Sequence, residues 1–460
     1  MSNQGKTVHV ALTTPLRLIP STCSRFSRPF ALVIACCMPL ATTWCAWRVA
    51  TATPGLDYFA FWSVVQLRRE NHPAAQKLYG LANQRRLGAA VAAAMGPAAT
   101  HTREAVAAST NLKLYDGRIE TWATPFLYGA LAQLMTGDYE RDYHFFVAFS
   151  LGSHALAIAL MCRGMGYSST LTGWCIAAFG LAFLPFTSNM VVLNVGALQL
   201  LQIAGLLALV RRRAMVAAGF LFGLAILFKP LVAPAAMALG IVMVADGHRR
   251  SVAGLVAGLA AGGGIAWLAG CLFLTDWTCW SDWSTGLQNL ISSTHLINSS
   301  SNCSLSSWAR AATGIDASAF ITAGLLGCTM LCAYHGRVAT SPEQSSESRP
   351  FDRLVLATCL GCLIALAGSP LVWPHYQLLC IPLLLWAGRR AISLSEHPAY
   401  SSLAALAFLL LSAFGSAMGL GRQATALFLG NVANLLLVLL AFHDLVHAAA
   451  EIEDGSAARA

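Results

Sequence analysis

An aspartate stands just after the first apolar run of the chain. Asp57 lies in the segment LDYFAFW, where aromatic residues follow it directly. A carboxylate at the outer end of a helix can take a proton from an incoming hydroxyl group, as general-base catalysis requires. The alternative is structural, because an aspartate at this place can also cap a helix that starts at Tyr58. Both interpretations of Asp57 stay open at the level of the residue pattern.

A single lysine interrupts a long apolar stretch. Lys229, in LFKPLVAP, is the only Asp, Glu, Lys or Arg between Arg213 and Asp246. A charge at the centre of a bilayer costs at least about 2.5–3.5 kcal/mol, so a lone one indicates a functional site. Pro230 follows and ends a helix, which frees backbone groups beside the ammonium. We expect Lys229 to bind a phosphate, although a lysine that snorkels to the interface has the same pattern.

Two later segments carry polar and aromatic residues next to apolar runs. The loop NCSLSSWAR ends at Arg310, whose guanidinium is suited to gripping a lipid phosphate. The segment SPLVWPHYQLL places Trp373, His375 and Tyr376 beside two prolines, and this composition suits a sugar or a phosphate. An interfacial anchor at Arg310 and an ordinary aromatic belt at the second segment are the structural alternatives.

The elements that position these residues are membrane helices. The chain is 57% hydrophobic and 11% charged, against roughly 25% charged residues in a soluble domain. Residues 251–274 and 423–442 contain no Asp, Glu, Lys or Arg, and about 20 such residues cross a bilayer core of about 30 Å. The sequence therefore predicts an all-α membrane bundle with about twelve transmembrane helices.

Basic residues in short loops predict the orientation of this bundle. Clusters such as Arg211–Arg213, Arg249–Arg250 and Arg389–Arg390 fall on one side if the N-terminus is cytoplasmic. We expect a cytoplasmic segment 1–28, a transmembrane domain 29–445 and a cytoplasmic tail 446–460. Long extracytoplasmic loops are then expected at 51–142 and 275–312, with interfacial helices in the first, near residues 57–70 and 122–136.

Several classes of function are excluded by what the sequence lacks. The net charge of +9 has no basic stripe or RNA-binding motif beside it, so nucleic-acid binding is not expected. A P-loop, a GxGxxG fingerprint, HExxH and GxSxG are all absent, and no metal site or cofactor is expected. Most of the fourteen cysteines lie in apolar runs, but Cys279 and Cys303 share a polar outer loop, where a disulfide is one option.

The motifs, taken in order, resemble glycosyltransferase family 87, the polyprenyl-phosphate-mannose-dependent mannosyltransferases of the GT-C fold. The resemblance covers roughly residues 50–390. Its motifs depart from the family where Ala123 and Thr124 precede Pro125 and where Gly196 and Gln199 are separated, which leaves the identity of donor and acceptor open. The residues that carry the resemblance are Asp57, Tyr58, Phe61, Trp62, Leu78, Tyr79, Pro125, Asn194, Gly196, Gln199, Lys229, Pro230, Asn302, Ser304, Leu305, Arg310, Ser369, Pro370, Trp373, His375 and Tyr376.

The resemblance implies a reaction and a set of roles. A sugar, with mannose as the family's best-known case, would pass from a polyprenyl-phosphate donor to a hydroxyl of a glycan or glycolipid acceptor at the extracytoplasmic face of the cell membrane. Asp57 would be the general base, and Lys229, Arg310 and His375 would neutralise the donor phosphate. The sugar and lipid would contact Tyr58, Trp62, Tyr79, Gln199, Asn302, Trp373 and Tyr376.

Two other classes of protein remain as alternatives. A transporter or flippase of lipid-linked sugars would also have many spans, but transporters place ionisable groups near the midplane of repeated halves. This chain places its candidate residues at outer helix ends, and its long first loop has no counterpart in the second half. The other alternative is a non-catalytic membrane scaffold, which loss of activity in an Asp57→Ala variant would argue against.

Overall fold

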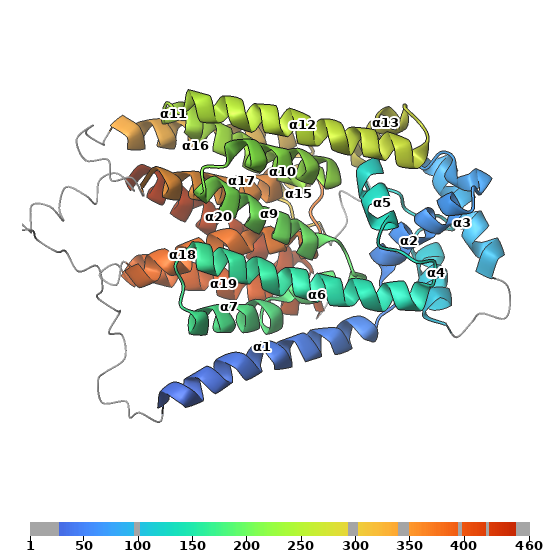
Figure 1. Ribbon diagram of the computed structural model, residues 1–460, viewed down its shortest axis with the longest axis horizontal. Helices are drawn as coiled ribbons and strands as arrows, with labels where there is room; N and C mark the ends of the chain where they lie inside the picture. Colours follow the sequence, from blue (N-terminus) through green and yellow to red (C-terminus); the bar gives the residue numbers. More distant parts are fainter. Residues whose placement is uncertain are drawn as a thin grey trace, which may run out of the picture.

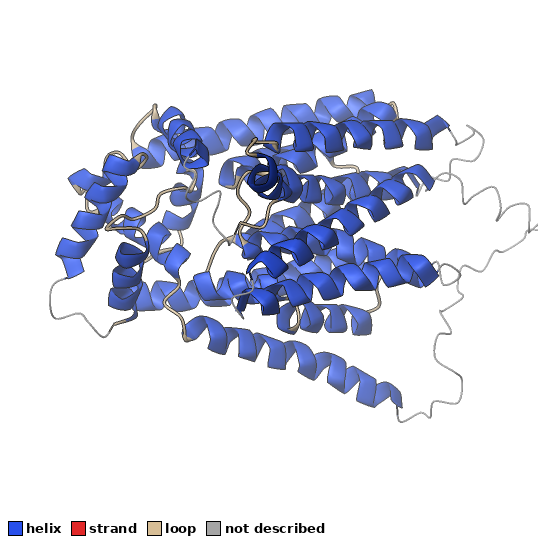
Figure 2. Ribbon diagram, turned by 180° about the vertical axis from the view of Figure 1, so that it is seen from behind, coloured by secondary structure: helices blue, strands red, loops and turns tan. Residues whose placement is uncertain are grey.

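The computed structural model describes residues 27–95, 102–292, 302–338, 349–393, 398–419 and 423–447. Every regular element among these residues is helical, and none is a strand (Figure 2). The expected all-α class is therefore confirmed. Most of the expected N-terminal segment 1–28 and of the expected tail 446–460 lies outside the described residues.

The helices differ widely in length, from three-residue turns to helices of 26 residues. In chain order they are α1 (Ser27–Thr51), α2 (Leu56–Arg69), η1 (Pro73–Ala75), α3 (Leu81–Met95), α4 (Arg103–Leu114), α5 (Pro125–Ala132), α6 (Tyr139–Gly164), α7 (Ser169–Leu181), α8 (Leu184–Val192), α9 (Gly196–Arg211), α10 (Met215–Phe228), η2 (Pro230–Val232), α11 (Ala233–Ala245), α12 (Arg249–Leu274), α13 (Cys279–Ser292), α15 (Leu305–Thr313), α16 (Ser318–Val338), α17 (Arg349–Gly368), η4 (Pro374–Cys380), α18 (Ile381–Ser393), α19 (Pro398–Gly419) and α20 (Gln423–His447).

The long helices run side by side as a bundle, and the short helices α2 to α5 gather with α13 at one end of it (Figure 1). Within the described residues, four helices are long and apolar enough to cross a membrane, namely α6, α12 and most of α16 and α20. The pair α7 and α8, bent by 58° at its break, would be a fifth span, and other apolar helices are shorter. A membrane bundle is thus supported, while the count of about twelve spans stays a prediction.

The helix that leads to Lys229 packs against α12 at backbone distance. A Cβ atom added at Gly219 of α10 would overlap the carbonyl oxygen of Leu255, and one at Gly258 of α12 would overlap that of Val216. Only glycine permits this approach, as in other membrane helix pairs with small residues at the interface. The end of α10 is therefore fixed relative to α12 by contacts that leave no room for a side chain.

Both stretches of the first long loop that were expected to be interfacial helices are helical, and their place at the membrane interface stays a prediction. The amphipathic stretch 57–70 folds as α2, which buries Tyr58, Phe59, Val64 and Val65. The apolar stretch that begins near Trp122 becomes the eight-residue helix α5, with Pro125 in its first turn. Two further helices, α3 and α4, were not among the predicted elements of this loop. Together, α2 to α5 cover one end of the bundle (Figure 1).

Candidate functional site

A cavity of about 680 Å³ lies where the short helices meet the bundle. Its wall is mostly apolar, but a few polar side chains converge in it. They come from α2, from α4 and the loop after it, from α8 and the turn after it, from the end of α10, from α13 and α16, and from the segment that runs from Ser369 into η4. These polar and aromatic residues are Asp57, Asn111, Tyr115, Glu120, Trp122, Thr124, Ser188, Asn194, Lys229, Trp283, Thr322, Ser369, Trp373, His375 and Tyr376.

Asp57 enters the cavity because a glycine turns the chain into α2. Gly55 has a φ of 68°, a conformation that residues with a Cβ rarely adopt. The helix then starts at Leu56, so that Asp57 lies inside its first turn. Its carboxylate accepts a 2.6 Å hydrogen bond from Nδ2 of Asn194. The structure therefore places Asp57 in the cavity wall, bound to a side chain from another helix.

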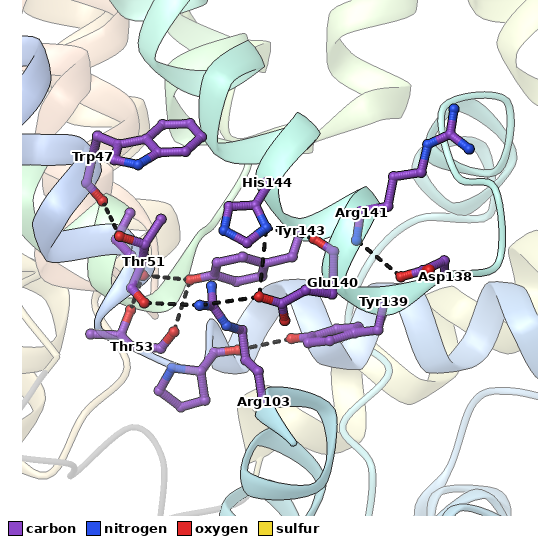
Figure 3. A network of polar contacts seen from close by, with 12 residues as sticks. Trp47, Thr51, Thr53, Arg103, Asp138, Tyr139, Glu140, Arg141, Tyr143 and His144 are labelled. Atoms are coloured by element: carbon purple, nitrogen blue, oxygen red, sulfur yellow. Dashed lines mark hydrogen bonds and ion pairs between the residues drawn. The ribbon is translucent and has the colours of Figure 1, made fainter. Parts of the chain in front are cut away.

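A network around α6 holds the segment that precedes Asp57 (Figure 3). The hydroxyl of Tyr143 donates to the carbonyls of Ala50 and Thr53 at 2.7 and 3.0 Å, and that of Tyr139 donates to the carbonyl of Pro54 at 2.8 Å. Arg103, at the start of α4, lies over the Tyr143 ring and pairs with Glu140 at 3.4 Å. These contacts fix residues 50–54 and α4 against α6, and thereby set the start of α2.

Asn194 links the aspartate to the lysine. It lies in the tight turn between α8 and α9, where the preceding Leu193 has a φ of 53°. Its Oδ1 accepts a 3.1 Å hydrogen bond from Nζ of Lys229, while its Nδ2 donates to Asp57. One buried amide thus joins a carboxylate and an ammonium that lie 172 positions apart in the chain (229 − 57 = 172). This chain of contacts is the polar centre of the cavity.

Lys229 stands where α10 ends and Pro230 begins η2. Its Nζ lies 3.7 Å from the centroid of the Tyr376 ring, within the range of a cation–π contact. The hydroxyl of Thr124, at the start of α5, donates to the carbonyls of Leu227 and Phe228 at 2.5 and 3.2 Å. These bonds satisfy carbonyl groups at the end of α10, which a helix leaves without internal partners.

The segment from Ser369 into the start of η4 supplies the opposite wall. Trp373, His375 and Tyr376 all line the cavity, and the His375 ring meets that of Tyr376 edge-on at 4.6 Å. Nε2 of His375 is buried and has no hydrogen-bond partner within the part of the chain that the structure describes. Asn302 holds this segment from behind: its Nδ2 donates to the carbonyl of Pro370 at 2.8 Å, and its Oδ1 accepts from Val372 N at 2.9 Å. Asn302 therefore positions the wall.

Other residues predicted for the site lie behind the cavity or away from it. Tyr58 stacks on Phe146, and Trp62 donates its indole N–H to Asp142 at 3.2 Å. Arg310, on α15, is not among the residues that line the cavity. Four other predicted residues do not line it either: Tyr58 and Trp62 on α2, Tyr79, whose hydroxyl donates to the Ala123 carbonyl, and Gln199, which is buried in α9.

Three residues of the loop after α4 were missed as site residues by the sequence analysis. Glu120 lines the cavity and accepts hydrogen bonds from the side chains of Tyr115 and Trp122. The signal was weak because a glutamate in a polar loop is common, whereas a lysine in an apolar run is not. Asn194 was noticed only as part of a family motif. The cavity thus has a second carboxylate beside Asp57.

Both carboxyl groups are biased toward holding a proton. Burial raises the pKa of Asp57, although the hydrogen bond from Asn194 and the charge of Lys229 act in the opposite direction. Burial raises the pKa of Glu120 to about 7, against the hydrogen bond from Trp122 and the charge of Arg118. A carboxylate whose pKa approaches the working pH is a better general base than one with an ordinary pKa. The described residues contain no group of three or more His, Cys, Asp or Glu side chains that could hold a metal ion.

Comparison of the chain with known proteins identifies one protein family. The model of glycosyltransferase family 87 matches residues 121–370, more than half of the chain. No curated protein and no solved structure matches it. The matched range contains Asn194 and Lys229, while Asp57 and His375 lie outside it and reach the same cavity through the fold. The matched range and the helical bundle agree that this chain belongs to glycosyltransferase family 87 and is a membrane glycosyltransferase.

Proposed function

We propose that the protein transfers mannose from a polyprenyl-phosphate donor to a hydroxyl group of a glycan or glycolipid acceptor. The transfer takes place at the extracytoplasmic face of the cell membrane, and Asp57 is the general base. One observation carries the proposal: a base and a cation, Asp57 and Lys229, share one amide partner in a cavity with mostly apolar walls. In this arrangement the acceptor hydroxyl loses its proton to Asp57, and the donor phosphate leaves beside Lys229.

The reaction needs one proton transfer and one displacement. The Asp57 carboxylate takes the proton of the acceptor hydroxyl, and the acceptor oxygen forms a bond to the anomeric carbon of the sugar. The bond between that carbon and the phosphate oxygen breaks, and polyprenyl phosphate leaves with one more negative charge. Lys229 faces this charge as it develops, where a preorganised cation stabilises the transition state. A single displacement inverts the configuration at the anomeric carbon.

The cavity wall suits both parts of the donor. Leu231, Pro234, Ala365 and Gly368 contribute apolar surface, which favours a lipid chain. On the side of the short helices, indole rings lie beside Glu120, and aromatic faces with a carboxylate are suited to a sugar ring. These rings belong to Trp122 and Trp283. Arg310 is left out of the proposed phosphate site because it does not line this cavity.

The orientation follows from the basic residues. Charges of Arg211, Arg389 and Arg390 act together on Asp352 at the start of α17, although their loops are far apart in the sequence. A cluster of arginines from several loops is typical of the cytoplasmic face of a membrane protein, because short cytoplasmic loops carry an excess of Lys and Arg. We infer that about twelve spans cross the membrane, with both termini in the cytoplasm and the cavity opening outside.

The function is tested with membranes that contain the full chain and radiolabelled polyprenyl-phosphate-mannose. We expect labelled product in these membranes and none in membranes without the protein. The same membranes given GDP-mannose, with synthesis of the lipid donor blocked, are expected to yield none. Product from GDP-mannose under that block would contradict the proposed donor. Absence of product from the lipid donor, with the protein present at normal levels, would contradict mannose as the sugar.

The rate of transfer is expected to fall as the pH is lowered, because the base must be deprotonated to act. The raised pKa of Asp57 places this loss at a higher pH than an ordinary aspartate would give. Asp57 and Glu120 repel each other when both are ionised. A Glu120→Gln variant should therefore move the acidic limb of kcat to lower pH. We would measure kcat against pH for both proteins, and an unchanged limb would show that Glu120 does not couple to the base.

A further inference from the structure

Two thiols meet at the corner between α12 and α13. Sγ of Cys271, in the last turn of α12, lies 3.9 Å from Sγ of Cys279, the first residue of α13. Both side chains are buried, each with 2% of its surface exposed. The sequence analysis had considered Cys279 with Cys303 instead. Cys303 lies at the other wall, where its backbone N–H donates to the Val372 carbonyl at 2.7 Å.

The corner around these thiols is held from several sides. Thr275 ends α12 with a φ of 49°, a left-handed conformation that costs free energy for a residue with a Cβ. Oδ1 of Asp276 accepts 2.8 Å hydrogen bonds from the backbone N–H and the hydroxyl of Thr278. Arg68, from α2, donates to the carbonyls of Phe273 and Leu274 at 3.3 and 2.6 Å. The two sulfurs therefore face each other at a fixed turn.

We propose that Cys271 and Cys279 form a disulfide in the mature protein. The proposal rests on the inferred orientation, which places this corner in the oxidising extracytoplasmic space. The two thiols lose two protons and two electrons and form one S–S bond. The electrons pass to the disulfide of a thiol oxidoreductase in that compartment, which is reduced to two thiols. To form the bond, the two sulfurs must close from 3.9 Å to about 2.05 Å.

The bond would secure the helix that closes the cavity. Trp283 and Leu287 of α13 line the cavity, and the Trp283 indole donates to the Trp122 carbonyl at 3.2 Å. The Trp280 indole donates back to the Trp267 carbonyl of α12 at 3.0 Å. A covalent link at the corner would limit the ways in which α13 can move relative to α12. It would thus keep the Trp122 and Trp283 wall in place when the cavity is empty.

A second pair of thiols provides a control within the same chain. Cys162, in the last turns of α6, makes a side-chain hydrogen bond with Cys175 of α7. This pair lies toward the end of α6 that Arg163 follows, which the inferred orientation places near the cytoplasm. Thiols there stay reduced in a cell. Both pairs are in side-chain contact, and the inferred orientation places them in different compartments.

The experiment blocks free thiols with N-ethylmaleimide during cell lysis and maps the peptides by mass spectrometry. We expect the peptide with Cys271 and Cys279 to lack two hydrogens and to carry no maleimide, and Cys162 and Cys175 to carry one maleimide each. In a Cys271→Ser variant, Cys279 should become alkylated. Reducing agent should lower the Tm of the wild type to that of the variant and leave the variant unchanged.

Mannose transfer, measured on the same membranes, separates this inference from the proposed function. Maleimide on both Cys271 and Cys279 in a protein that transfers mannose would overturn the disulfide alone. A linked pair in a protein without transfer would support the disulfide and count against the proposed reaction. A linked Cys162–Cys175 pair beside a free Cys271–Cys279 pair would overturn both the disulfide and the orientation.

Discussion

Replacing Asp57 with asparagine is expected to lower the rate of mannose transfer by about 10²–10⁴-fold, the usual contribution of a general base. Asparagine has nearly the same shape but cannot accept a proton. It can keep the bond from Asn194 Nδ2 when its own amide oxygen faces that donor. The measurement is kcat for radiolabelled transfer, with the amount of protein in the membrane matched to the wild type.

The matched control is Asp276→Asn, since Asp276 is a carboxylate at the α12–α13 corner that does not line the cavity. It should leave kcat within a few-fold of the wild type. If Asp57→Asn transferred mannose as fast as the wild type, Asp57 would not be the base. A loss confined to Asp276→Asn would move the search for the base to that corner, where Asp282 also lies.

Replacing Lys229 with methionine is expected to reduce kcat/KM for the donor by about 10²–10³-fold, comparable to removal of an oxyanion donor. Methionine fills a similar volume but leaves the departing phosphate without its cation. Lys229→Arg keeps the charge, yet its planar guanidinium cannot occupy the place of an ammonium between Asn194 and the Tyr376 ring without displacing them. We expect an intermediate loss for this variant.

Arg310→Met removes the same charge from a residue that does not line the cavity, and we expect kcat/KM to change little. The three variants are compared at saturating and limiting donor concentrations, with thermal stability in detergent as the check on folding. A larger loss for Arg310→Met than for Lys229→Met would place the donor phosphate at α15 instead. Equal activity of Lys229→Met and the wild type would remove Lys229 from the proposed mechanism.

The class of fold could be predicted from composition because long uncharged runs have few soluble alternatives. The two amphipathic and apolar stretches of the first loop were also recognised, as α2 and α5. The helices α3 and α4 were not, since their mixed polarity resembles that of an exposed loop. The break between α7 and α8 lay beyond what periodicity can reveal, because both halves are apolar and Pro185 is the only local sign of it.

The cavity was predicted in part. Asp57, Lys229, Trp373, His375 and Tyr376 stood out in the sequence, and the fold brings all five to one cavity. Residues such as Tyr58 and Gln199 were expected there as well, but they pack behind the wall. A motif shows which positions matter and not the direction of each side chain. That direction depends on where a helix begins, and Gly55 fixes this for α2.

Glu120 and the thiol pair show the other limit of sequence reasoning. Glu120 acquires its raised pKa from burial by distant segments, and nothing in its neighbours signals this. Cys271 was taken for a small apolar residue of a membrane helix, and only the turn at Thr275 brings it to Cys279. Tertiary contacts created both properties.

The glycine contact between α10 and α12 divides the protein into parts with different freedom to change. A methyl group at Gly219 would meet the Leu255 carbonyl, so few amino-acid substitutions are tolerated where these two helices touch. The ammonium of Lys229, at the end of α10, therefore keeps its position. Glu120, in the loop after α4, and Trp283, on α13, line the cavity outside this helix pair. New sugar and acceptor preferences can therefore arise by exchange of cavity residues outside this pair, around the proposed phosphate-binding Lys229, and a library aimed at altered specificity belongs at those positions.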